Sequence, residues 1–398
     1  MTWDRPASRL IHNGDGRFQL KLAASASLPE TFPIYLTSVF AFTDPGAVDD
    51  IYEKRADGYI YSRLGSPNAD AAAAIMAAAE ESEDALVFSS GMAAITTAIL
   101  SLVRAGDHII SSPAIYGGVH DFFANELKRF GVEVSFTGPD GEGVVDLARP
   151  STRLIYTEMI SNPLMRVPDI ARLADAAGRL GIPLVVDNTF ATPAVAKVLD
   201  LGADLAVYSA TKYLGGHSDI LAGAVPGSRE RLDGIRRLGK LYGNGLGAVE
   251  SWLLARSLRT LDIRMARHSE NGLKTALFLE SHPKVEKVFY PGLASSPSHS
   301  AAVRQFPGGR FGGMLSFNLR GGETEATGLI RALDGIPFAP SLAGAATTLS
   351  YSIKTSHRFY SRKELAEAGI TASQIRLSAG LEDAADILAV LEEGLSRI

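Results

Sequence analysis

Residues 203–219 read ADLAVYSATKYLGGHSD, so a short apolar run leads directly into a polar turn that carries one lysine. The run has the character of a buried strand, and the two glycines after Lys212 are typical of a turn. Most lysines lie solvated at the protein surface, and Lys212 taken alone could be one of them. The same place, at the end of a strand, also suits an amine that acts as a nucleophile. The rest of the chain must decide between these two interpretations.

Short β-rich runs alternate with helical stretches from residue 85 to residue 227. The expected strands are ALVFSS, DHIISSP, VEVSFT, RLIYTEM, PLVVDNT, ADLAVYSA and LAGAVPG. The expected helices between them are MAAITTAILSLVRAG, GGVHDFFANELKRFG and DIARLADAAGRLG, and each closes on a glycine, which often ends a helix. This alternation predicts an α/β fold with a mostly parallel sheet, in which ligands bind at the carboxyl ends of the strands.

The remaining segments predict three parts. Residues 1–60 hold prolines and polar turns with little periodicity, and we expect an extended N-terminal arm. Residues 61–260 would form the large cofactor-binding α/β domain, which opens with an alanine-rich helix over residues 69–85. Residues 243–282 would form one or two long helices that lead out of this domain. Residues 261–398 would form a smaller C-terminal α+β domain that ends in a helix.

Composition narrows the functional classes. The chain has 398 residues, 46% of them hydrophobic, and a formal net charge of −5, which argues against nucleic acid or an acidic membrane as a partner. There are no cysteines, so disulfides, thiolate metal sites and a cysteine nucleophile are excluded, and we assign no metal ligands. The N-terminal stretch MTWDRPASRLIHNGDG lacks the apolar core of a signal peptide, and we expect a cytoplasmic protein.

Two strand ends carry groups suited to a phosphorylated ring. Ser89-Ser90-Gly91-Met92 lies where a strand meets a helix, and backbone N–H groups at a helix N-terminus bind phosphate, although serine is also a common helix cap. Asp187 ends the buried run PLVVDNTF. A buried aspartate needs a cation or hydrogen bonds, although it could also close a turn.

Other strand ends add further candidate groups. Glu158 and Asn162 follow another strand in TEMISNP, where Asn-Pro is also a common turn signal. Tyr116 precedes two glycines in AIYGG and could anchor a loop or stack on an aromatic ring. Arg376 lies in the apolar stretch QIRLSAGLED, where its planar fork suits a carboxylate or a structural salt bridge. Taken together, these groups and Lys212 are the parts that pyridoxal phosphate needs: the lysine forms a Schiff base and the aspartate keeps the ring nitrogen protonated.

Seven motifs also resemble, in their order along the chain, those of one known family. They are YSRLGSPN, SSGMAAI, AIYGG, VVDNTF, YSATKYLGGHSD, SLRTLDIRM and RLSAGLED. The chain is identified as a member of the pyridoxal-phosphate family of Cys/Met metabolism, over nearly its whole length from PIYLTSVFAF onward. The resemblance implies pyridoxal 5'-phosphate as cofactor and the type I, aspartate-aminotransferase-like fold.

The resemblance also implies roles for individual residues. Lys212 would hold the cofactor and move protons at Cα and Cβ of the substrate, and Tyr116 would stack on the ring and could protonate the leaving group. The phosphate would be bound by Gly91, Met92, Ser209 and Thr211, the ring nitrogen by Asp187 and the ring hydroxyl by Asn162. Arg376 would bind the substrate carboxylate with help from Ser341. Tyr61, which also faces substrate, and Arg63 would reach the cofactor of the neighbouring subunit, which implies an obligatory homodimer and commonly a homotetramer.

Departures from the family pattern fall where the distal part of the substrate is expected. SLAGAATT places Ala346 where cystathionine-handling members have a glutamate, and the residues after Tyr116 lack the cysteine typical of methionine γ-lyases. The segment YSIKTSHRFYS introduces Lys354 near the expected substrate entrance. We therefore predict γ-elimination or γ-replacement on a γ-substituted L-homoserine-type amino acid with an atypical leaving group, such as an O-linked one in O-acylhomoserine or canavanine, or a thiol. The alternatives are β-elimination of cystathionine or cysteine conjugates and a non-catalytic cofactor-binding protein.

Overall fold

The computed structural model describes residues 5–12, 29–355, 358, 362–367 and 369–398. The chain divides into two compact units, each made of segments distant in sequence. Unit 1 comprises Met1–Ser101, Val207–Gly215 and Asp219–Thr260, and unit 2 comprises Leu102–Ala206, Gly216–Ser218 and Leu261–Ile398. The three domains expected from the sequence stay a prediction. Within the described ranges, no helix combines the length and the apolar character that crossing a membrane requires.

A seven-stranded sheet has the order β1-β7-β6-β5-β4-β2-β3. Its strands are β1 (Asp84–Phe88), β2 (His108–Ser111), β3 (Glu133–Phe136), β4 (Thr152–Glu158), β5 (Leu184–Asp187), β6 (Leu205–Val207) and β7 (Gly223–Gly227). Strands β2 to β5 belong to unit 2, β1 and β7 belong to unit 1, and β6 is divided between the units after Ala206. In unit 2 the pairs β2–β3, β2–β4 and β4–β5 are parallel, whereas β1 pairs with β7 antiparallel in unit 1. The mostly parallel α/β architecture expected from the alternating pattern is confirmed.

The central strands are buried on both faces, because their side chains are apolar at nearly every position rather than at every second one. All residues of β2, β5, β6 and β7 are buried. A helical segment crosses between β2 and β3 as α6 (Gly117–Asp121), a π-helical turn (Phe122–Glu126) and α7 (Leu127–Arg129). Here the ring of Phe123 lies edge-on to that of Tyr156, with 5.1 Å between centroids, so that the helical segment is fixed on the strand that leads to the site.

The helix α8 (Ile170–Leu180) precedes β5 in unit 2 and follows its expected signals closely. Asp169 accepts a hydrogen bond from the backbone N–H of Arg172 at its start, and Gly181 closes it with a φ of 66°. The helix α5 (Gly91–Leu102) instead ends before Gly106, where we expected its end. The carboxylate of Asp107 accepts the N–H of Arg104 at 2.9 Å, and this side-chain bond competes with helical continuation.

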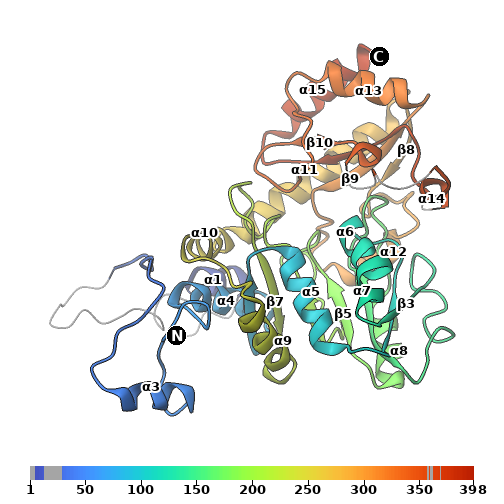
Figure 1. The fold of residues 1–398 in the computed structure, drawn as a ribbon. Helices are drawn as coiled ribbons and strands as arrows, with labels where there is room; N and C mark the ends of the chain where they lie inside the picture. Colours follow the sequence, from blue (N-terminus) through green and yellow to red (C-terminus); the bar gives the residue numbers. More distant parts are fainter. Residues whose placement is uncertain (1–4, 13–28, 356–357, 359–361, 368) are drawn as a thin grey trace. The chain divides into compact units, whose positions relative to one another are not determined.

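A second, four-stranded antiparallel sheet of unit 2 has the order β10-β11-β9-β8. The helices α11 and α15 pack together and α13 packs on α15, as the upper part of Figure 1 shows, and α11 also contacts β8 and β9. These elements, with a 3-10 turn, are α11 (Leu261–Ser281), β8 (Val285–Phe289), α12 (His299–Gln305), β9 (Met314–Leu319), α13 (Glu323–Ala332), β10 (Thr348–Ser350), the turn Ser352–Lys354, α14 (Arg362–Glu367), β11 (Gln374–Ser378) and α15 (Ala384–Ser396). The expected α+β character of this C-terminal part is confirmed.

In unit 1, α4 is the central helix. It contacts α10, α1, β1 and β7, because its alanines let neighbouring backbones approach closely. The helices of this unit are α1 (Pro6–His12), α3 (Pro45–Tyr52), α4 (Pro67–Glu80), α5, α9 (Arg229–Tyr242) and α10 (Ala248–Leu258), and several are labelled in Figure 1. The segment in which we expected one or two long helices therefore forms two, α10 and α11.

The N-terminal arm expected over residues 1–60 stays a prediction, but its described part is not extended throughout. Residues 1–4 and 13–28 lie outside the described residues, and the described part contains two short helices, α1 and α3. The helix α3 begins because Asp44 accepts the backbone N–H of Gly46 at 3.0 Å and Pro45 occupies the first helical position. Pro45, one of the prolines that suggested extended structure, therefore begins a helix.

Candidate active site

Two acidic side chains end neighbouring strands of unit 2. Glu158 is the last residue of β4, Asp187 is the last residue of β5, and the two are paired in the register of these parallel strands. Both carboxyl groups are buried, with 7% of each residue exposed. Asp187 accepts the backbone N–H of Thr189 at 2.9 Å and the hydroxyl of Tyr156 at 3.4 Å. In the described part of the chain, no lysine or arginine forms an ion pair with Asp187.

Burial of this pair shifts its proton equilibria. Desolvation raises the pKa of Asp187 to about 6, although hydrogen bonds from Thr189 and Tyr156 oppose the rise. Desolvation also raises the pKa of Glu158 well above its usual range, and the neighbouring charge of Asp187 adds to this rise. Two buried acids without a cation are costly, so the site is suited to a ligand that brings positive charge to it.

Tyr116 lies at the end of the loop that joins β2 to α6, where its backbone N–H donates to Oε1 of Glu158 at 2.6 Å. It is the residue before the first turn of α6, and its side chain is 45% exposed. A Cβ on Gly118 would lie 2.7 Å from Cε1 of Tyr116, so that glycine allows the ring to lie against this turn. The backbone of Tyr116 is therefore fixed by a hydrogen bond while its ring stays accessible, and a residue that stacks on a cofactor ring needs both.

Arg376 belongs to the central strand β11 of the small sheet and is only 4% exposed. Its Nη1 donates to Oδ1 of Asn162 at 2.8 Å, and its Nη2 donates to the hydroxyl of Ser350 at 3.1 Å. Ser350 is the partner of Arg376 in the register of β10 and β11. Residues that lie far apart in sequence thus orient one guanidinium, which suits the capture of a carboxylate.

Unit 1 holds the residues predicted to bind phosphate. A Cβ on Gly91 would lie 2.7 Å from Cβ of Ser209, so the first turn of α5 and the turn after β6 approach as closely as only a glycine allows. The hydroxyl of Ser90 accepts the N–H of Ala93 and caps α5, which leaves other amides of its first turn, including that of Met92, for an anion.

Lys212 stands in the same turn. Its backbone N–H donates to the carbonyl of Ser209 at 3.1 Å, and its side chain is half-buried. Thr211 fixes this turn, because its hydroxyl accepts the N–H of Ala222 at 3.0 Å and donates to the carbonyl of the same residue at 3.2 Å. Lys212 therefore lies in a turn that is fixed by hydrogen bonds. An amine that reacts with a ligand needs such a fixed position.

Tyr61 and Arg63 lie on an exposed stretch of unit 1. The guanidinium of Arg63 lies 5.7 Å from the centroid of the Tyr61 ring, and its Nη1 donates to the carbonyl of Lys240 at 2.5 Å. Tyr61 is 41% exposed. An accessible cation beside an aromatic ring is what the predicted contact with a neighbouring subunit needs.

The loop before β10 contains the predicted substrate residue Ser341, which is half-buried. The loop is held by Ala343, whose N–H donates to the hydroxyl of Ser378 in β11 at 2.8 Å. Ala346 in the same loop is exposed and offers no carboxylate. Lys354 forms an exposed ion pair with Glu323 of α13, with 2.8 Å between Nζ and Oε1. Part of the segment after it, residues 356–357 and 359–361, lies outside the described residues.

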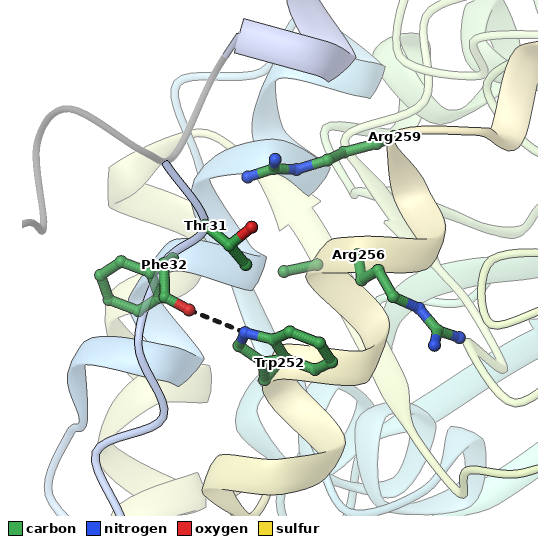
Figure 2. A pocket seen from close by; sticks show the side chains of 6 residues that line it. Thr31, Phe32, Trp252, Arg256 and Arg259 are labelled. Carbon is green, nitrogen blue, oxygen red and sulfur yellow. Dashed lines mark hydrogen bonds between the residues drawn. The ribbon is translucent and has the colours of Figure 1, made fainter. Parts of the chain in front are cut away.

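A separate pocket of about 220 Å³ lies in unit 1. Figure 2 shows that the indole N–H of Trp252 donates to the carbonyl of Phe32, and that Arg259 reaches toward Thr31 whereas Arg256 points away from Phe32. The lining residues are Thr31, Phe32, Trp252, Ala255, Arg256 and Arg259. None of the predicted site residues lines this pocket, and it offers no general base, so we do not assign the chemistry to it.

Sequence reasoning missed three contributing residues. Tyr156 and Thr189 hydrogen-bond Asp187, and Ser350 hydrogen-bonds Arg376. Tyr156 reads as one more apolar strand residue, and only the pairing of β4 with β5 brings its hydroxyl to the carboxylate. Within unit 2, the structure brings Asn162 and Arg376 into direct contact and links Tyr116 to Glu158.

Known structures share this fold over the whole chain. The crystal structure of cystathionine γ-lyase from Lactobacillus plantarum complexed with L-serine has a TM-score of 0.89 and 35% sequence identity, and the match covers 99% of both chains. The class of protein is thus that of the type I pyridoxal-phosphate enzymes, and the fold class expected from the sequence is confirmed. Among curated proteins, L-methionine γ-lyase from Treponema denticola is 38% identical over 98% of this chain and 97% of its own length. Cystathionine γ-lyase from Bacillus subtilis is 38% identical over 92% of this chain and 94% of its own length.

The family described as Cys/Met metabolism PLP-dependent enzyme matches residues 20–396, and the chain belongs to this family. It is therefore an enzyme that uses pyridoxal 5'-phosphate, as the resemblance implied. The residues present fit this cofactor. Asp187 is a buried carboxylate suited to a protonated ring nitrogen, and the glycine-dependent approach of Gly91 to Ser209 at a helix N-terminus is suited to a phosphate.

Proposed function

We propose that this enzyme catalyses γ-elimination or γ-replacement on a γ-substituted L-homoserine-type amino acid. The observation that carries the proposal is a cluster of unit 2, in which the buried Arg376 donates to Asn162 and Tyr116 donates to the buried Glu158. Relatives with γ-directed activities support it, because L-methionine γ-lyases and an O-succinylhomoserine sulfhydrylase from Pseudomonas aeruginosa are 35–40% identical to this chain.

Each residue of the candidate site would have its own role in binding the cofactor, binding the substrate or transferring protons. Lys212 would hold the cofactor through its ε-amine, Asp187 would hold the ring nitrogen, and Gly91, Met92, Ser209 and Thr211 would bind the phosphate. The bound cofactor supplies an electron sink for the charge left when a proton departs from carbon. Arg376, positioned by Asn162, would bind the substrate carboxylate together with Ser341. Once released, the amine of Lys212 would take the proton first from Cα and then from Cβ, and the hydroxyl of Tyr116 would protonate the leaving group.

The overall chemistry then balances without an oxidant. A substrate with group X at Cγ reacts with water to give 2-oxobutanoate, ammonia and HX. In γ-replacement, a nucleophile takes the place of X and the amino group is kept. The exposed Ala346 favours substrates whose distal part carries no ammonium group, since no carboxylate stands at this position to bind one. We therefore propose an O-linked leaving group, as in O-acylhomoserine or canavanine, with a thiol as the alternative.

We also propose a cytoplasmic homodimer that pairs into a homotetramer. The exposed Tyr61 and Arg63 would complete the neighbouring subunit's phosphate site, and their accessibility supports this role. Because this chain would then supply groups to a second copy of itself, a monomer would be inactive.

A substrate panel tests the proposal. Purified enzyme is incubated with O-acetylhomoserine, O-succinylhomoserine, cystathionine, methionine, homocysteine and canavanine, and 2-oxobutanoate, pyruvate, ammonia and homoserine are measured. We expect 2-oxobutanoate with ammonia, or homoserine, from an O-linked substrate. Pyruvate from cystathionine would instead support β-elimination. A yellow protein whose spectrum changes with no amino acid would support a non-catalytic role.

A further inference from the structure

The carboxyl group of Glu158 faces two loops of unit 2 at once. It accepts the backbone N–H of Tyr116, in the loop after β2, at 2.6 Å, and the backbone of Asn162, in the loop after β4, also acts on this carboxyl group, because it opposes the rise of its pKa. Burial of Glu158 keeps water from both contacts, so each is stronger than it would be at the surface. One side chain thus ties together the backbones that carry a stacking ring and a ring-hydroxyl ligand.

We propose that Glu158 is a positioning residue, which fixes the backbones of Tyr116 and Asn162 so that their side chains meet the cofactor in the working arrangement. This inference rests on the proposed function, from which it takes the roles of those two residues. It adds a role for a side chain that has no contact with substrate in that mechanism.

The surroundings of Tyr116 show why this tie matters. The carbonyl of Tyr116 accepts the N–H groups of Val119 and His120, so its C-terminal side is held by α6. Its ring is nearly half exposed, and the packing of the ring therefore does little to fix it. The bond to Glu158 is what holds the N-terminal side of the residue, and without it the ring could turn with its backbone.

The tie extends to Arg376 through Asn162. Oδ1 of Asn162 accepts Nη1 of Arg376 at 2.8 Å, so a shift in the backbone of Asn162 would also move the guanidinium. Small displacements of such groups are costly, because a misplacement of about 1 Å can lower a rate by about 100-fold. Glu158 therefore influences both the ring contact and the expected carboxylate contact.

A matched control separates positioning from general stability. Asp107 is also buried in unit 2, accepts a backbone N–H from Arg104 at 2.9 Å and pairs with Arg153 at 2.9 Å. It lies just before β2, the strand that leads to Tyr116, but it contacts neither loop. Asp107→Ala therefore removes a comparable buried carboxylate without loosening the site.

The experiment compares the full-length Glu158→Met, Glu158→Gln and Asp107→Ala variants with the wild type, each with and without pyridoxal phosphate. Methionine keeps the volume of glutamate but is a poor acceptor, whereas glutamine keeps an acceptor oxygen. Hydrogen–deuterium exchange of the Tyr116 and Asn162 amides is the readout that does not depend on activity. We expect Glu158→Met to speed this exchange by about tenfold, Glu158→Gln by less than about threefold, and Asp107→Ala to leave it unchanged.

Cofactor affinity and kinetics complete the test. We expect Glu158→Met to raise the dissociation constant for pyridoxal phosphate by about tenfold and to lower kcat by about 10- to 100-fold. In a Tyr116→Ala, Asn162→Ala background the same change should lower kcat by less than about threefold more, because its effect passes through those residues. Exchange, affinity and kcat that match those of Asp107→Ala would overturn the proposal.

Two outcomes are kept distinct. If Glu158→Met does not fold, Glu158→Asp carries the test, because its shorter side chain cannot span both amides and must speed exchange of at least one by about threefold. Unchanged exchange in that variant would refute the role. A failure of the proposed function is seen earlier, as a wild-type enzyme that turns over no γ-substituted substrate, and the exchange result is independent of it.

Discussion

Because the carboxyl group of Asp187 is buried, we expect its negative charge to lower the free energy of unfolding of the cofactor-free protein. Its pKa is raised from 3.8 to about 6, mainly by desolvation. At about 1.4 kcal/mol per pKa unit, this rise corresponds to about 3 kcal/mol. Between these two pH values the folded protein keeps the proton that the unfolded chain has lost. The free energy of unfolding of the cofactor-free protein should therefore fall as pH rises from about 4 to about 6, and stay lower above it.

The substitution Asp187→Asn removes this dependence. The amide oxygen can still accept the hydrogen bonds from Thr189 and Tyr156, but the group no longer ionises. We expect the difference in unfolding free energy, variant minus wild type, to increase by about 3 kcal/mol between pH 4 and pH 8. Urea unfolding of the two cofactor-free proteins, followed by tryptophan fluorescence at several pH values, measures this difference.

Asp187→Asn should also bind pyridoxal phosphate more weakly, because it lacks the carboxylate expected to pair with the ring nitrogen. Saturating pyridoxal phosphate should stabilise the wild type against urea far more than it stabilises Asp187→Asn, because ligand stabilisation follows affinity. Parallel curves of stability against pH for the two cofactor-free proteins would refute the reasoning that Asp187 is strained by desolvation. Equal stabilisation of both proteins by the cofactor would refute its role at the ring nitrogen.

Three further outcomes are expected. Lys212→Ala should lose the visible absorbance of the held cofactor and all turnover, Arg63→Ala should bind the cofactor more weakly, and mixing the two should restore part of the activity through hybrid dimers; no gain on mixing would argue against a shared site. Arg376→Lys should raise KM by about 10-fold or more with a smaller change in kcat, because a lysine cannot make the bidentate contact, and an unchanged KM in steady-state assays would contradict this. Phe123→Ala should destabilise the protein by about 3–5 kcal/mol, since the ring is fully buried against Tyr156, and calorimetry that shows an unchanged Tm would contradict it.

Regular elements of the fold could be predicted because their signals are local. The largely apolar strands β2, β5 and β7 are buried at every position, and Asp169 and Gly181 bound α8 as caps do. Prediction failed where a side chain competes with the backbone pattern. Asp107 captures the N–H of Arg104 beyond the end of α5, and Asp44 with Pro45 begins a helix in a segment expected to be extended.

The candidate residues of the site could likewise be named from strand ends, but their partners could not. Asp187 was found because an acid that ends an apolar strand is unusual. Tyr156 and Ser350 carry no such signal, since a hydroxyl within a strand is ordinary. Their roles follow from the pairing of β4 with β5 and of β10 with β11, which brings each hydroxyl to a charged group.

The amino-acid sequence by itself determined the α/β alternation, the family, the cofactor and the candidate site residues. These depend on apolar periodicity, turn chemistry and short motifs, all of which are local in the chain. Only the tertiary structure decided which residues are neighbours or hydrogen-bond partners: the pairing of Glu158 with Asp187 in the strand register, the bond from Tyr116 to Glu158 and the bond from Arg376 to Asn162. The physical reason is that burial and long-range contacts set these interactions, and residues 214 positions apart meet only when the chain has folded.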